Sequence, residues 1–237
     1  MTEIRNYKTA DDVAAAAAEN AVEILQIATE AKETAYWVLA GGSSPVLAYK
    51  KLIKDFSGAV DWSKVTVLMG DERMVPFADK ASNYGTIMVM FDKSPELSKV
   101  KRIAPDTSLN TEEAARDYAE KIATENIGEF DLVWIGVGED GHTLSLFPGN
   151  QAFIEPSNEW VAPVYDSPKP PSERISLSLK ALEYVDELVI FAVGASKQKA
   201  LEEARLKRKL PIAVAADTVE ASGGEVRWLY DEAAWND

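Results

Sequence analysis

The middle of the chain reads Phe130-Asp-Leu-Val-Trp-Ile-Gly-Val-Gly-Glu-Asp-Gly-His-Thr-Leu-Ser-Leu-Phe-Pro-Gly149. Its short apolar run, residues 132–135, has the character of a buried strand. A glycine-rich turn closes this strand, and at such a turn the backbone folds tightly and a small ligand can approach closely. The turn leads to His142, the only histidine among the 237 residues. This stretch therefore places the only imidazole of the chain directly after a predicted buried strand and its glycine turn.

The same pattern, an apolar strand closed by a glycine turn, recurs along the chain. Further strands are predicted at residues 36–40, 65–69 and 188–193, and the turns that close them span 41–45, 70–73 and 194–197. Helices are predicted over residues 11–33, 46–54, 83–92 and 111–126, and from the last of these turns to about residue 206. Asp11 or Asp12 is the expected cap of the first helix.

Continuous apolar strands that alternate with helices predict an α/β fold, a doubly wound and mostly parallel sheet with helices on both faces. In such sheets the loops after the strands meet at one edge, where ligands bind. We therefore expect the glycine turns to converge on one site. No segment rich in glycine, serine or proline divides the chain, so a single domain is expected over residues 1–237.

Composition excludes several classes of function. The chain has no cysteine, which rules out disulfides, thiolate metal sites and a cysteine nucleophile. With one histidine in addition, we expect no transition metal. The net charge of −14 argues against nucleic acid and anionic membranes as partners, although a local cluster of cations and backbone N–H groups can still hold a small anion. The N-terminus lacks an apolar signal region and no stretch is long enough to span a membrane, which predicts a cytoplasmic protein.

His142 is the only side chain of the chain whose ordinary pKa, about 6.5, suits proton transfer near neutrality. Asp140, two residues before it, could fix the tautomer of the imidazole and raise its basicity. The alternative is a hydrogen-bonded histidine without a catalytic role. A serine triad is not expected, because the sequence contains no Gly-x-Ser-x-Gly elbow.

Gly136, Gly138 and Gly141 match the G-x-G-x-x-G pattern of dinucleotide sites. A dinucleotide site needs a helix to start at the last glycine, and Pro148 and Gly149 interrupt this region within two turns. We therefore expect no nicotinamide cofactor, and no other cofactor is indicated.

The other glycine turns each allow two interpretations. The turn at 41–45 could hold a phosphate on backbone N–H groups and hydroxyls, or could be only a tight turn with a helix cap. Arg73 could clamp a phosphate or a polarised carbonyl while Asp71 binds sugar hydroxyls, or both could belong to a surface ion-pair cluster. Lys197 could provide a point charge for phosphate or could be an ordinary solvent lysine.

Taken together, these segments resemble the 6-phosphogluconolactonases, from about residue 10 to 234. The matching stretches, in chain order, are Leu39-Ala-Gly-Gly-Ser-Ser-Pro45, Gly70-Asp-Glu-Arg73, Val75-Pro76, Ser82-Asn-Tyr84, residues 136–149, Arg174-Ile-Ser-Leu177, Gly194-Ala-Ser-Lys197 and Trp228. The departures are mild, since Ala40 and Ser44 stand where the family often has serine and threonine.

The related glucosamine-6-phosphate deaminases share the glycine-rich phosphate loop and an Asp-Gly-His. They carry Asp-Glu-Tyr where this chain has Asp71-Glu-Arg73, and Ile-Ala-Phe-Asn-Glu-Pro where it has Thr143-Leu-Ser-Leu-Phe-Pro148. The second difference removes the carboxylate partner that a deaminase uses. The lactonase is therefore the favoured interpretation, with a deaminase-like enzyme or a non-catalytic sugar-phosphate-binding protein as alternatives.

The resemblance implies a Rossmann-like fold similar to that of glucosamine-6-phosphate deaminase, and the hydrolysis of 6-phospho-D-glucono-1,5-lactone in the oxidative pentose phosphate pathway. His142 is then the general base and Asp140 its orienting carboxylate, while Arg73 belongs to the site with its role open. The expected substrate-binding and phosphate-binding residues are Gly41, Gly42, Ser43, Ser44, Asp71, Arg174 and Lys197. The partner is a small sugar-phosphate lactone, and the protein is expected to be a monomer or a small homo-oligomer.

Overall fold

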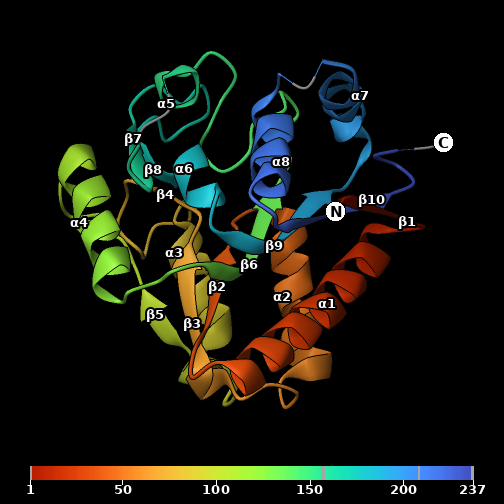
Figure 1. Cartoon of the computed structure of the whole chain (residues 1–237), viewed down its shortest axis with the longest axis vertical. Helices are drawn as coiled ribbons and strands as arrows, with labels where there is room; N and C mark the ends of the chain where they lie inside the picture. The colour runs from red at the N-terminus through yellow and green to blue at the C-terminus, as the bar shows by residue number, and fades with distance from the viewer. Residues whose placement is uncertain (1, 156–157, 208, 236–237) are drawn as a thin grey trace.

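A computed structural model of the chain describes residues 2–155, 158–207 and 209–235, and is built around a parallel sheet (Figure 1). The strands of this sheet are β1 (Thr2–Tyr7), β2 (Ala35–Leu39), β3 (Val65–Met69), β5 (Lys101–Ile103), β6 (Phe130–Gly136), β9 (Val185–Ala192) and β10 (Glu225–Asp231). Their order is β1-β10-β9-β6-β2-β3-β5, and every neighbouring pair is parallel.

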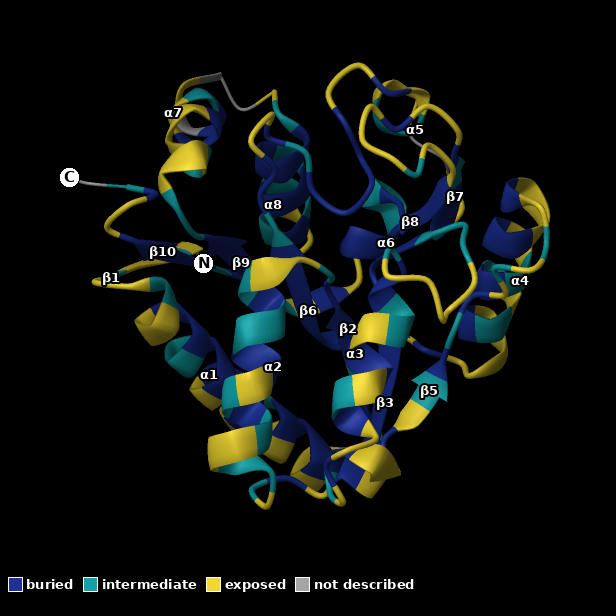
Figure 2. Ribbon diagram, turned by 180° about the vertical axis from the view of Figure 1, so that it is seen from behind, coloured by how far each residue is buried: buried dark blue, intermediate teal, exposed yellow. Residues whose placement is uncertain are grey.

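Helices cover both faces of the sheet, which confirms the predicted fold class. One face packs against α1 (Ala10–Ala31), α2 (Ser43–Phe56) and α3 (Asn83–Phe91), and the other against α4 (Thr111–Thr124), α7 (Gln198–Lys207) and α8 (Pro211–Ala221). Strand β6 shows why both faces are apolar. Leu132 and Trp134 enter the first core, whereas Val133 and Ile135 enter the second. Figure 2 shows the central strands buried beneath these helices.

A small antiparallel sheet extends the fold on the α4 side and was not expected from the sequence. It consists of β4 (Asp71–Arg73), β8 (Arg174–Leu177) and β7 (Val161–Val164), in the order β4-β8-β7. In its register Arg73 lies opposite Arg174. This pairing brings together two cations that are a hundred residues apart in the sequence.

The predicted strands and helices are all present, with ends that differ by a few residues. The sequence did not indicate β1, β5, β10 or α8. Strand β1 is a mostly exposed edge strand, TEIRNY, that lacks an apolar run, and β5 has only three residues. The expected cap of α1 was wrong, because Thr9 caps this helix and Asp12 closes the capping box from the third helical position. Among the described residues, no helix combines the length and apolar character needed to cross a membrane.

The connections of the central strands define a crevice. Strands β2 and β6 are neighbours; β2 continues through α2 to β3 on one side, while β6 is paired with β9 on the other. The loops that leave β2 and β6 therefore diverge, and such a point at the carboxyl edge of a parallel sheet is where open α/β folds bind ligands.

Candidate active site

A cavity of about 220 Å³ opens at this crevice. It is lined by residues from each glycine turn and from the loop before β8, including Gly41, Gly42, Ser43, Ser44, Asp71, Arg73, Gly138, His142, Lys169, Arg174 and Lys197. The predicted convergence of the glycine turns is thus confirmed. Of the residues predicted from the sequence, only Asp140 does not line the cavity itself, and it contacts His142 directly.

The imidazole of His142 is held in a defined orientation. Its Nδ1 lies 2.5 Å from Oδ1 of Asp140, and its ring stacks on Phe147 with the centroids 4.3 Å apart. An ionised carboxylate only accepts hydrogen bonds, so Nδ1 carries the proton and Nε2 carries the lone pair. The described residues form no hydrogen bond to Nε2. The neutral ring is therefore prepared to accept a proton from a group in the cavity.

The local backbone explains why glycines surround this pair. The N–H of Gly138 donates to the carbonyl of His142 at 2.8 Å, and the N–H of Gly141 donates to the carbonyl of Gly138 at 3.0 Å. A Cβ atom on Gly138 would lie 1.9 Å from Nδ1 of His142, so a side chain at that position would collide with the imidazole. Gly141 has a φ of +78°, which favours glycine. The chain makes this compact turn where a dinucleotide site requires a helix.

Burial and charge act in opposite directions on His142. Burial lowers its pKa, the Asp140 carboxylate raises it, and the net shift is downward. For Asp140, burial raises the pKa, but the hydrogen bond and charge of His142 outweigh burial and leave the pKa lowered. The pair therefore consists of a neutral imidazole and an ionised carboxylate near neutral pH.

Cations gather in the same cavity although the chain as a whole is acidic. Arg174 is 3% exposed; its Nε donates to the carbonyl of Pro171 at 3.0 Å and its Nη2 to the carbonyl of Lys169 at 2.8 Å. Burial lowers the pKa of Arg174 and also that of Lys197. Arg73 donates from Nη1 to the carbonyl of Ala81 at 2.6 Å. Such a desolvated cluster of positive charge suits an anionic ligand.

Asp71 and Glu72 are adjacent but have different surroundings. Oδ2 of Asp71 accepts from Oγ of Ser145 at 2.6 Å and Oδ1 accepts from Nδ2 of Asn83 at 3.2 Å, which fixes this carboxylate at the wall of the cavity. Glu72 is fully buried and accepts from the backbone N–H groups of Asn83 and Tyr84 at the start of α3. Burial raises the pKa of Glu72, and these hydrogen bonds oppose that rise. Glu72 is thus a structural anchor for α3.

Two loops at the cavity share one backbone geometry. Gly42 precedes α2 with a φ of +99°, and Gly194 precedes the short 3-10 helix η3 (Ala195–Lys197) with a φ of +91°. Neither helix start receives a capping hydrogen bond from a side chain. In α2, a helix of 14 residues, the N–H groups of the first turn are therefore available to an anion, and the positive end of the helix dipole favours one.

Comparison with known proteins agrees with this geometry. The model of the family described as glucosamine-6-phosphate isomerases/6-phosphogluconolactonase matches residues 8–228. The chain belongs to this family. A 6-phosphogluconolactonase of Bos taurus is 36% identical over 207 residues, covering 83% of this chain and 78% of the relative. The Homo sapiens 6-phosphogluconolactonase is 34% identical over 205 residues, with the same coverage of 83% and 78%.

Solved structures of 6-phosphogluconolactonases share the fold of this chain. A 6-phosphogluconolactonase from Trypanosoma brucei superposes with a TM-score of 0.83 at 26% identity, covering 99% of this chain and 97% of that one. The Thermotoga maritima structure, at 24% identity, has a TM-score of 0.84 and covers 98% of this chain and 100% of that one, which supports the fold. The chain is an enzyme of this family.

Three residues of the site were not predicted from the sequence. Lys169 lines the cavity with its Nζ 4.0 Å from Oδ1 of Asp140, while Asn83 and Ser145 hold Asp71. Prolines at 168, 170 and 171 surround Lys169 and are typical of a loop, and Asn83 and Ser145 both fall within segments that match the family. No local pattern shows that these residues face one cavity.

Proposed function

We propose that the protein hydrolyses 6-phospho-D-glucono-1,5-lactone to 6-phosphogluconate, the lactonase step of the oxidative pentose phosphate pathway. One observation carries the proposal: an Asp140-oriented imidazole shares a cavity with a cluster of buried and half-buried cations. A lactone carbonyl is already electrophilic, so its hydrolysis needs a base for water and a holder for the phosphate. The curated relatives that carry this activity in their names support the same assignment.

The chemical step uses both protonation states of His142. Nε2 accepts a proton from water as the water oxygen bonds to C1, and the carbonyl oxygen becomes an oxyanion. When the tetrahedral intermediate collapses, the bond from C1 to the ring oxygen breaks and the imidazolium returns its proton to that oxygen. General acid–base assistance of this kind contributes roughly 10²–10⁴-fold. Asp140 stabilises the imidazolium and keeps Nδ1 protonated.

The cations position the substrate. The first turn of α2, together with Arg174 and Lys197, forms the proposed phosphate site, and Asp71 is placed to accept from a sugar hydroxyl. Arg73 lies opposite Arg174 across the small sheet and is assigned to the phosphate or to the developing oxyanion. Fixing the phosphate orients C1 toward His142, so that binding energy from a remote group supports the reaction.

The test is continuous acid release from freshly prepared 6-phosphogluconolactone, with spontaneous opening subtracted, for the wild type and His142→Ala. We expect catalysis by the wild type and a loss of roughly 10²–10⁴-fold in kcat for the variant. The affinity for 6-phosphogluconate, measured by calorimetry, should stay within about threefold, because the cations that hold the phosphate are unchanged.

Three outcomes would change the assignment. If catalysis survives in His142→Ala, the enzyme is a lactonase with a different base. If the wild type fails to accelerate lactone opening but releases ammonia from glucosamine 6-phosphate, the protein is a deaminase-like enzyme. If 6-phosphogluconate binds and neither reaction is catalysed, the protein is a sugar-phosphate-binding protein.

A further inference from the structure

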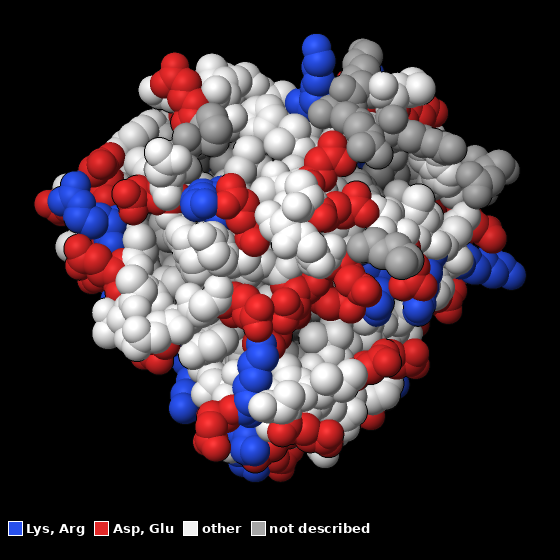
Figure 3. All heavy atoms as spheres, viewed as in Figure 1, with Lys and Arg blue, Asp and Glu red and all other residues white. Residues whose placement is uncertain are grey.

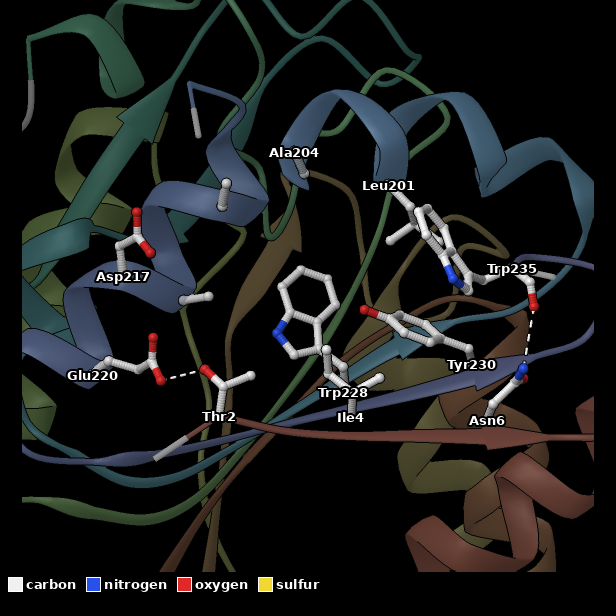
Figure 4. Close-up of a pocket in the computed structure, with 12 residues that line it drawn as sticks. Thr2, Ile4, Asn6, Leu201, Ala204, Asp217, Glu220, Trp228, Tyr230 and Trp235 are labelled. Carbon is white, nitrogen blue, oxygen red and sulfur yellow. Dashed lines mark hydrogen bonds between the residues drawn. The ribbon is translucent and has the colours of Figure 1, made fainter. Parts of the chain in front are cut away.

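A second, larger cavity of about 360 Å³ lies between the edge strand β1, its neighbour β10 and the helices α7 and α8 (Figure 4). Among the residues that the structure describes, none lines both this cavity and the catalytic one. We call it the edge groove; its lining includes Thr2, Ile4, Asn6, Leu201, Asp217, Glu220, Trp228, Tyr230 and Trp235.

Strand register explains why this groove exists. Ile4 pairs with Trp228 and Asn6 pairs with Tyr230 in the parallel ladder, and alternate residues of a strand point to the same face. The face that carries these side chains is packed by α7 and α8 near β9 but is left open at β1, the edge of the sheet. Ile4 is consequently 63% exposed, whereas Trp228 and Tyr230 beneath the helices are each 9% exposed.

The chemistry of the groove is aromatic and acidic. In Figure 4 the indole of Trp228 lies between the carboxylates of α8, Asp217 and Glu220, on one side and Tyr230 and Trp235 on the other. The ring centroids of Trp228 and Tyr230 are 5.9 Å apart, and those of Tyr230 and Trp235 are 6.4 Å apart. The described lining residues include no lysine or arginine. Aromatic faces and carboxylates both attract cations, whereas they repel the anionic groups that suit the catalytic cavity.

We propose that the edge groove binds a small organic ammonium ion that carries an apolar body. The ammonium group would lie against the carboxylate of Glu220 and the hydroxyl of Thr2, and the apolar body would pack on Trp228 and toward Leu201. The hydroxyl oxygen of Thr2 supplies a neutral acceptor beside the carboxylates of α8 and already donates to Glu220, whereas Asn6 lies at the opposite end of the groove beside Trp235. A primary ammonium has three N–H donors and no acceptor, which matches this set of acceptors.

The field of the whole molecule favours the same ligand. The net charge is −14, and Figure 3 shows a band of acidic side chains across the face seen in Figure 1. This field raises the local concentration of cations and opposes anions outside the catalytic cavity. The size of the groove is adequate for an arylalkyl amine, since ligand pockets begin at about 300 Å³.

The test is calorimetric titration of the full chain with 2-phenylethylammonium and, separately, with uncharged 2-phenylethanol. We expect the ammonium to bind at least about tenfold more tightly than the alcohol, because the two differ only in the charged donor group. Glu220→Gln should weaken binding of the ammonium roughly three- to fivefold, and Asp217→Asn provides an independent variant on the same wall.

Matched variants distinguish binding in the edge groove from an effect of net charge and from binding in the catalytic cavity. Glu225→Gln changes the net charge by the same amount at an exposed position whose side chain belongs to the opposite face of β10, and should leave the affinity unchanged. Asp140→Asn, at the other cavity, should leave it unchanged as well. Equal binding of alcohol and ammonium, or equal weakening by Glu225→Gln and Glu220→Gln, would overturn the proposal, as would absence of binding to the wild type at millimolar concentration.

Discussion

The catalytic cavity and the edge groove have opposite chemistry within one acidic chain. The first gathers Arg73, Lys169, Arg174 and Lys197 around one imidazole, and the second combines aromatic rings with the carboxylates of α8. The first is built by loops at the carboxyl edge of the central strands. The second is built by side chains that alternate along the edge strand β1 and its neighbour β10, together with side chains of α7 and α8.

This difference shows how a doubly wound fold divides its surface. Loops at the carboxyl edge converge from distant parts of the chain, so they can concentrate positive charge and free N–H groups against the average charge of the protein. An edge strand has only one neighbour, and a helix layer that stops short of it leaves an open face. Catalysis in the first region depends on the orientation of His142 relative to the substrate. Binding in the second region depends on how well the charge and shape of the groove complement its ligand.

Among variants that keep His142, the largest effect should come from Gly138→Ala, which tests whether the catalytic cavity depends on orientation. The added methyl group would meet His142 and Asp140 at the same time, at 1.9 Å and 2.6 Å, so that the pair must move. A displacement of about 1 Å costs roughly 10²-fold in rate. We expect that loss in kcat/KM, measured by acid release, with an unchanged cooperative melting curve.

Gly128→Ala is the matched control, because the added methyl group has open space around it. Its kcat/KM should remain near that of the wild type. Full activity of Gly138→Ala would show that the orientation of His142 is not required.

A smaller effect is expected from Asp140→Asn, which keeps a hydrogen-bond acceptor for Nδ1 but removes the charge. Charge-assisted hydrogen bonds are roughly twice as strong as neutral ones, which predicts a loss of about tenfold in kcat. The pH profile provides a sharper measurement. The reaction requires neutral His142, whose pKa lies below its ordinary value, so the acid limb of kcat/KM should lie below pH 6.5 in the wild type.

The carboxylate of Asp140 raises the pKa of His142 against the effect of burial. Its removal should therefore move the acid limb to still lower pH. A limb that moves to higher pH, or does not move, would contradict the assignment of this limb to His142.

The smallest effect should come from Glu220→Gln in the edge groove. We expect kcat and KM for the lactone to stay within about twofold of the wild type, and the free energy of unfolding to change by less than about 0.5 kcal/mol, because the side chain is half-exposed and its substitute retains an acceptor for Thr2. Lactone turnover and thermal unfolding measure the two quantities. A large loss of activity would mean that the two regions are coupled.

The central strands and the helices beside them could be predicted because each has a continuous apolar signal, such as residues 132–135. Edge strand β1 and the three-residue β5 lack that signal, since half-exposed strands at a sheet margin need few apolar residues. Strand β8 escaped prediction for another reason, because antiparallel pairing with β4 is a long-range choice. That choice places Arg174 beside Arg73 and could not be inferred from either segment alone.

The sequence by itself determined the fold class, the family resemblance and the identity of the only imidazole, because these depend on local apolar periodicity, glycine turns and residue type. Tertiary structure alone decided that Asp140 contacts His142, that Lys169 lies near both, and that Trp228, Tyr230 and Trp235 share a groove with the carboxylates of α8. The Asp140–His142 contact depends on the tight turn at Gly138 and Gly141, whose path the residue pattern does not fix. In the other two cases, strand order and loop path bring side chains together across large sequence separations, and no local pattern records which partners will meet.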